Sequence, residues 1–166
     1  MSEATADTTP PAFDIHIERT MRAPAERIYK AFLDPYAQAK FSPPNGYVAS
    51  YEVDARVGGG FKGTFRQIDT GEEHSFSGTY LALDEFTRIQ LTDAFETGDV
   101  DMQNVMVSTY TFEEQGDGTT KVTIEQTNVP GVIPRDYVEI GWNQSLDLLT
   151  LLVEYDAEPL SGPSMT

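Results

Sequence analysis

Residues 134–155 read PRDYVEIGWNQSLDLLTLLVEY, and their apolar side chains recur with the period of an α-helix. One stripe of this expected helix carries Val138, Gly141, Trp142, Ser145, Leu146, Leu149, Leu152 and Val153. At roughly 1.5 Å per residue, the helix is on the order of 30 Å long. Because it follows a series of expected strands, we expect it to lie across the concave face of a curved sheet, which covers its apolar stripe.

The residues before this helix, from 47 to 128, have the features of antiparallel strands and turns. The expected strands are Val48–Asp54, Gly60–Ile68, His74–Leu83, Thr87–Asp93, Asn104–Phe112 and Thr120–Asn128. Residues 69–72 (DTGE) and 116–118 (GDG) supply the positive backbone angles that tight hairpins need. No proline interrupts these strands, which favours a meander.

The N-terminal part of the chain predicts one further strand and two short helices. Phe13–Met21 alternates with period two, Ala25–Leu33 has helical spacing, and a second short helix begins at Asp34-Pro35 and runs to about Phe41. The expected order is therefore β-α-α-β6-α, an α+β class. We expect a single domain over residues 12–157, with an N-terminal tail at 1–11 and a C-terminal tail at 158–166.

Composition excludes several classes of protein. The 166 residues carry 27 acidic and 11 basic side chains, a formal net charge of −16, which disfavours nucleic acids and anionic membrane surfaces as partners. Nine Phe, eight Tyr and one Trp favour a packed core over a disordered acidic chain. Cysteine is absent, which excludes disulfides, thiolate metal sites and cysteine nucleophiles.

The sequence also bears on location and on where the charge lies. No apolar run approaches the roughly 20 residues of a transmembrane helix, and the N-terminus lacks the pattern of a secretory signal, so we expect a soluble cytoplasmic protein. Residues 1–88 hold 13 acids and 9 bases, whereas residues 89–166 hold 14 acids and 2 bases. The acidic second half is interpreted either as a solubility or salt-habitat feature, or as a docking face.

Four local motifs carry a resemblance to a known family. They are Arg19–Pro24 followed by Ile28–Phe32, Asp34-Pro35 with the downstream Phe41, Glu52–Phe61 with Gly78-Thr79-Tyr80, and Gly141-Trp142 followed by Leu146 and Leu149. The element order resembles the helix-grip fold of the START and birch-pollen-allergen (SRPBCC) superfamily. The motifs resemble its branch named for activators of the heat-shock-protein-90 ATPase, over about residues 13–155. Tyr29 and Phe41 stand where that branch commonly has Trp, which reshapes a cavity wall.

The resemblance implies a sheet wrapped around the long helix with a cavity between them, and inward-facing side chains as ligand contacts. The candidate ligand-binding residues are Arg19, Tyr29, Phe32, Phe41, Phe61, Phe65, Phe76, Tyr80, Met106, Tyr110, Trp142, Leu146 and Leu149. The aromatic members either form a wall for a flat apolar ligand or fill a collapsed core. Arg19 either anchors an anionic or carbonyl ligand or pairs with a carboxylate.

From the remaining polar and glycine-rich motifs we predict no catalytic residue, no metal site and no cofactor. His16 and His74 lie on different expected strands and lack metal-ligand spacing; His74 is read as an exposed hairpin residue or as a general base. Gly58-Gly59-Gly60 precedes no helix and predicts a turn rather than a phosphate cradle. The acidic cluster Asp93, Glu96, Asp99 and Asp101 predicts a solvated turn, with a divalent-cation site as the alternative.

The function that these observations favour is binding of a hydrophobic or aromatic small molecule between the sheet and the C-terminal helix. Two alternatives follow from the resemblance. The first is a chaperone-accessory or stress-response module. The second is a polyketide cyclase-like enzyme, which needs a polar pair in the cavity with Arg19, His74 and Tyr110 as candidates. The expected assembly is a monomer or a homodimer.

Overall fold

The computed structural model describes residues 9–155. Its elements are β1 (Phe13–Met21), α1 (Ala25–Leu33), α2 (Pro35–Phe41), β2 (Tyr47–Val53), β3 (Gly60–Gln67), β4 (Glu73–Asp84), β5 (Arg88–Phe95), the 3₁₀ helix η1 (Val100–Met102), β6 (Met106–Glu114), β7 (Thr120–Val129) and α3 (Arg135–Tyr155). This order confirms the predicted α+β class. The predicted C-terminal tail, and most of the N-terminal one, lie outside the described residues.

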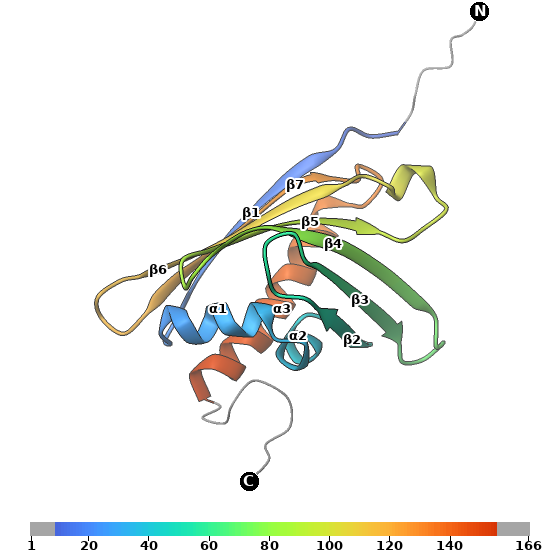
Figure 1. Cartoon of the computed structure of the whole chain (residues 1–166). Helices are drawn as coiled ribbons and strands as arrows, with labels where there is room; N and C mark the ends of the chain where they lie inside the picture. Colours follow the sequence, from blue (N-terminus) through green and yellow to red (C-terminus); the bar gives the residue numbers. More distant parts are fainter. Residues whose placement is uncertain (1–8, 156–166) are drawn as a thin grey trace, which may run out of the picture.

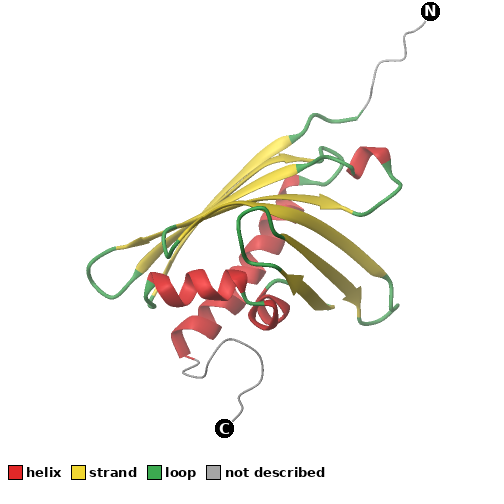
Figure 2. Ribbon diagram, in the orientation of Figure 1, coloured by secondary structure: helices red, strands yellow, loops and turns green. Residues whose placement is uncertain are grey.

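The strands form one antiparallel sheet of seven strands in the order β1-β7-β6-β5-β4-β3-β2. The sheet curves, and α1, α2 and α3 all lie on the same side of it (Figures 1 and 2). The strands β5 and β6 extend two residues beyond their predicted C-terminal ends because their neighbours continue the ladder: Phe95 of β5 pairs with Phe76, and Glu114 of β6 pairs with Thr120. The expected meander from β2 to β7 is confirmed, and β1 pairs with β7.

The junction between α1 and α2 follows from local sequence chemistry. Asp34 ends α1 and is the N-cap of α2, where its Oδ1 accepts a hydrogen bond of 2.8 Å from the backbone N–H of Tyr36. Pro35 occupies the first position of α2, where no intrahelical N–H is needed. The resulting bend brings the rings of Phe32 and Phe41 to 5.3 Å, and both are buried against the sheet.

The long helix α3 makes two different contacts with the sheet. Leu146 and Leu149, in its C-terminal half, are fully buried in the main hydrophobic core. Trp142 and Val138, in its N-terminal half, are only partly buried. None of the helices within residues 9–155 is long and apolar enough to cross a membrane. The unequal packing of α3 leaves space between its N-terminal half and the sheet.

Candidate functional site

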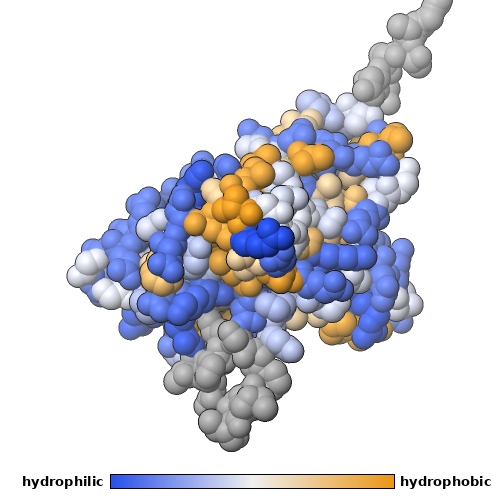
Figure 3. Space-filling view, in the orientation of Figure 1, coloured by the Kyte–Doolittle hydropathy of each residue, from blue (hydrophilic) through white to orange (hydrophobic). Residues whose placement is uncertain are grey.

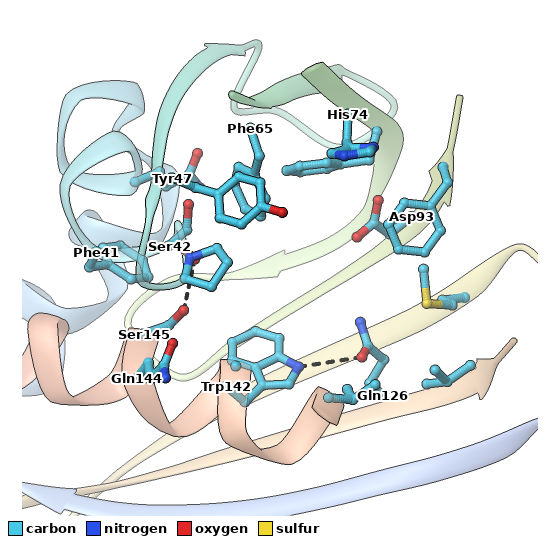
Figure 4. A pocket seen from close by; sticks show the side chains of 18 of the residues that line it. Phe41, Ser42, Tyr47, Phe65, His74, Asp93, Gln126, Trp142, Gln144 and Ser145 are labelled. Carbon is cyan, nitrogen blue, oxygen red and sulfur yellow. Dashed lines mark hydrogen bonds between the residues drawn. The ribbon is translucent and has the colours of Figure 1, made fainter. Parts of the chain in front are cut away.

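A cavity of about 650 Å³ occupies the space between the concave face of the sheet and the N-terminal half of α3. Its walls come from six of the seven strands, from α1, from α2 and the loop after it, and from α3. Figure 4 shows part of this lining. Exposed side chains at its edge, among them His74, Tyr137 and Ile140, mark where it meets solvent. This volume lies in the range of small-molecule sites.

One wall of the cavity is an aromatic cluster on β2, β3 and β4. The ring of Phe76 lies 4.9 Å from that of Phe65 and 5.9 Å from that of Tyr51, both in edge-to-face contact. Gly63 makes this arrangement possible, because a Cβ at that position would lie 2.4 Å from Cζ of Phe76. The packed rings therefore form a wall that rises from the sheet and lines the cavity.

The opposite wall is built on α3 around Trp142. Its indole Nε1 donates to Oε1 of Gln126 on β7 at 3.3 Å, and its ring lies 5.8 Å from that of Tyr110 (Figure 4). Gln126 is itself held by a hydrogen bond from its Nε2 to Oγ of the buried Ser108. Because both polar ends of Gln126 are engaged, the orientation of Trp142 is set by the sheet.

The loop after α2 closes the cavity on one side and is tied to α3. Ser145 Oγ donates to the backbone carbonyl of Ser42 at 2.8 Å (Figure 4), and the backbone N–H of Asn45 donates to Oε1 of Gln144 at 3.1 Å. The Ser42 hydroxyl also lies 2.6 Å from the hydroxyl of Tyr51. These contacts hold helix, loop and strand together at the cavity edge.

Asp93 on β5 places a carboxyl group in this apolar setting. Figure 4 shows the group directed into the pocket, and its Oδ1 is shielded from solvent and makes no hydrogen bond with any residue from 9 to 155. Burial raises the pKa of Asp93 to about 7, and a hydrogen bond from the backbone of Ala94 opposes that shift. Such a carboxyl changes its charge near neutral pH, which is unusual for an aspartate.

Three tyrosines with raised pKa values, Tyr51, Tyr80 and Tyr110, line the same cavity as Asp93. Burial is the largest cause of the raised pKa values of Tyr51, Tyr80 and Tyr110, and it raises that of Tyr80 to about 12. The negative charge of Asp93 contributes to the raised pKa of Tyr51 and of Tyr110. The three hydroxyls therefore remain protonated over the physiological pH range and can donate hydrogen bonds.

Nine of the thirteen candidate residues line this cavity. They are Phe32, Phe41, Phe61, Phe65, Phe76, Tyr80, Met106, Tyr110 and Trp142. Strand alternation and helical spacing placed them on inward faces, and the curvature of the sheet brings those faces together.

The other four candidates lie outside the cavity lining. Arg19 faces α3, as its strand alternation predicts, but its Nη1 pairs with Oδ1 of Asp147 at 2.8 Å and its Nη2 donates to Asn143. Of the two interpretations of Arg19, a ligand anchor or a carboxylate pair, the structure has the carboxylate pair. Tyr29, Leu146 and Leu149 pack in the main core because α1 presses against the C-terminal half of α3 and leaves no space there.

The prediction of a solvated acidic turn is wrong for Asp93, although Glu96, Asp99 and Asp101 are exposed. Leu91, Asp93 and Phe95 alternate along β5 and all line the cavity, so the period of the strand was the signal that could have found Asp93. Gln126 on β7 was also missed, and strand alternation was again the signal that could have found it.

The histidines are separate from this polar centre. His74 lies at the cavity edge with its side chain 51% exposed, and its Nε2 is 3.7 Å from a carboxylate oxygen of Glu72. His16 lies on β1 beside Glu18 and Glu125 and is exposed. Hydrogen bonding to Glu18 is the largest cause that raises its pKa. Within residues 9–155, no group of three His, Asp or Glu side chains could hold a metal ion.

Comparison with known proteins places this geometry in context. The family model described as "Activator of Hsp90 ATPase homolog 1-like protein" matches residues 22–154. The crystal structure of protein CV1439 from Chromobacterium violaceum is 41% identical, with a TM-score of 0.82 over 86% of this chain and 98% of that one.

More distant structures share the fold. Protein Ms6760 from Mycobacterium smegmatis is 22% identical, with a TM-score of 0.70 over 89% of this chain and 94% of that one. Protein NE0264 from Nitrosomonas europaea is 18% identical, with a TM-score of 0.69 over 84% and 93%. No curated protein sequence matches the chain significantly.

Proposed function

The chain belongs to the family of Activator of Hsp90 ATPase homolog 1-like proteins, and we propose that its cavity binds a hydrophobic or aromatic small molecule. One observation carries the proposal: a space of about 650 Å³ lined mainly by aromatic and aliphatic side chains. A core of collapsed side chains, the alternative interpretation of the same residues, would leave no such space.

The energetics support a ligand of modest affinity. A flat bicyclic compound that buries about 200 Å² of apolar surface gains roughly 5 kcal/mol at about 25 cal/mol per Å². Loss of translational and rotational freedom costs at least about 4 kcal/mol and offsets most of this gain. The pre-formed walls reduce the further cost of ordering, because Trp142 is held by Gln126 and the loop at Ser42 is held by Ser145.

Gly141 offers a direct test. It lies on the cavity side of α3, and a Cβ added there meets no atom of the described residues within 4 Å. The variant Gly141→Leu therefore places a branched side chain in the cavity without a backbone clash. Gly141→Ala is the matched control, because it makes the same backbone change and leaves most of the space open.

The probe is N-phenyl-1-naphthylamine, an uncharged aromatic dye whose fluorescence rises in apolar surroundings. We expect the wild type and Gly141→Ala to bind it at one site with similar affinity, and Gly141→Leu to bind at least about tenfold more weakly. Circular dichroism verifies that each variant is folded. A wild type that does not bind the dye, or equal binding by Gly141→Leu, would contradict the proposal.

The two alternative functions have less support among the described residues. The cyclase-like interpretation needs a polar pair in the cavity. Of its three candidates, Tyr110 lines the cavity, His74 stands at its edge and Arg19 lies outside it. The chaperone-accessory reading follows from the family description, and no contact within residues 9–155 adds to it. Both stay predictions from resemblance.

A further inference from the structure

The cavity is chemically one-sided. Of the residues that line it, Asp93 is the one acidic side chain, and neither Lys nor Arg is among them. His74 is the other ionisable group besides the tyrosines, and it stands at the solvent edge beside Glu72. A ligand inside the cavity therefore meets one carboxyl group and no permanent cation.

The Asp93 carboxyl has an oxygen that is free to accept a hydrogen bond from a ligand. Oδ1 is shielded from solvent and has no hydrogen-bond partner in the described part of the chain, although buried polar groups are normally paired. The residues on either side of it on the cavity face, Leu91 and Phe95, are apolar. A carboxylate with one unpaired oxygen in such surroundings favours a hydrogen-bond donor and repels another anion.

Resting on the proposed binding function, we infer that the ligand is an aromatic compound whose polar end donates a hydrogen bond to Asp93, and that carboxylate ligands are excluded. The donor is a hydroxyl group or a protonated amine, since both present an N–H or O–H to a carboxylate oxygen. The rings of Tyr51, Phe76 and Tyr110 also line the cavity, and the face of an aromatic ring attracts an ammonium group.

The test uses three compounds that share one naphthalene ring: 2-naphthalenemethanol, 2-(aminomethyl)naphthalene and 2-naphthoic acid. Dissociation constants are measured by calorimetry at pH 8 for the wild type and for Asp93→Asn, which keeps the shape and removes the charge. Asp69→Asn is the matched control, because Asp69 is exposed in the hairpin between β3 and β4.

We expect the wild type and Asp69→Asn to bind the alcohol and the amine at least about tenfold more tightly than the acid. In Asp93→Asn the acid should bind no more than about threefold more weakly than the alcohol. Of the three compounds, the amine should lose the most affinity relative to the wild type. Of the two donors, tighter binding of the amine identifies an ammonium ligand, and equal or tighter binding of the alcohol identifies a hydroxyl.

Two results would overturn the inference and leave the binding function intact: an acid that binds the wild type as tightly as the alcohol, or a preference that survives unchanged in Asp93→Asn. Failure of all three compounds, together with failure of the uncharged dye, would overturn both. Repeating the titrations at pH 6 adds a second readout, because protonation of Asp93 should weaken the discrimination.

The groups that face Asp93 determine how that pH series is read. The hydroxyls of Tyr51, Tyr80 and Tyr110 stay protonated from pH 6 to pH 8, so they do not change charge in the experiment. His74 at the cavity edge is the remaining titratable group. The series is therefore repeated in His74→Gln, and a pH effect that disappears there would assign it to His74 and count against Asp93.

Discussion

Single side chains decide the chemistry of this cavity, and Asp93 decides most of it. Its neighbours on the cavity face of β5 are apolar, its Oδ1 lacks a hydrogen-bond partner among residues 9–155, and burial raises its pKa to about 7. A carboxyl in that state is a cost to folding above neutral pH, because the unfolded chain solvates it freely. Natural proteins retain such costs mainly at functional positions.

This cost predicts how stability depends on pH. Between pH 5 and pH 7 the unfolded chain has Asp93 ionised while the folded chain keeps it protonated, so the raised pKa makes the free energy of unfolding fall as pH rises. Asp93→Asn lacks this dependence. Its stability relative to the wild type should therefore rise by about 2–3 kcal/mol from pH 5 to pH 8.

Urea denaturation at pH 5, 6, 7 and 8 measures this difference. Asp69→Asn again serves as the control, and its curve should run parallel to that of the wild type. If the curve of Asp93→Asn is also parallel, Asp93 titrates as an ordinary aspartate and the buried-carboxyl interpretation is wrong.

The secondary-structure elements position these side chains through their ends and through their glycines. Asp34 caps α2, Gly63 leaves room for the ring of Phe76, and Gly78 accommodates the close approach of β5. Gly141 is different. It lies within a regular helix, has open space around its missing side chain, and contributes the helix-weakening flexibility of glycine.

Two identical chemical changes should therefore have opposite effects. Gly141→Ala should raise the free energy of unfolding by about 1 kcal/mol, because alanine has a higher helix propensity and its Cβ meets nothing. Gly78→Ala should lower it by about 1–3 kcal/mol, because its Cβ would lie 1.7 Å from the backbone oxygen of Thr92. Thermal and urea unfolding of both variants check the signs, and a destabilised Gly141→Ala would contradict the first.

At the scale of the whole molecule, the acidic charge and the apolar cavity occupy different places. The face drawn in Figure 3 is mostly hydrophilic, with hydrophobic side chains gathered in a band near its centre. The formal net charge is −16, and most acidic side chains within residues 9–155 are exposed, while Asp93 is the one acid of the cavity lining. The surface carboxylates therefore repel one another, and the net charge does not indicate the chemistry of the ligand.

Salt should consequently stabilise the fold. Raising NaCl from about 20 mM to about 500 mM shortens the Debye length from roughly 20 Å to about 4 Å and screens the repulsion among surface carboxylates. We expect the melting temperature to rise by several degrees, about 3–8 °C. Differential scanning calorimetry measures the rise, and an uncharged osmolyte at equal osmolality controls for solvent effects. A flat or falling curve would show that surface repulsion is negligible.

The order of the elements and most of their ends follow from sequence, because period-two and period-3.6 patterns are local properties. β1 and α1 begin and end where the pattern of Phe13–Met21 and Ala25–Leu33 places them. Nine cavity residues also follow from sequence, because strand alternation and helical spacing place them on inward faces. Arg19 shows the limit of that rule: its direction is predicted, and its partner Asp147 is not.

Tertiary structure alone decides where the long helix packs tightly and where it stands off from the sheet. Leu146 and Leu149 share one apolar stripe with Trp142, yet the first two are core and the last is a cavity wall. Sequence determines which face of α3 is apolar, because that depends on spacing along one helix. The curvature of the sheet and the position of α1 determine how much of that face is covered, because both depend on contacts between distant segments. The same contacts place Asp93, which the sequence predicts to be a surface acid, as the one carboxyl group among the residues that line the cavity.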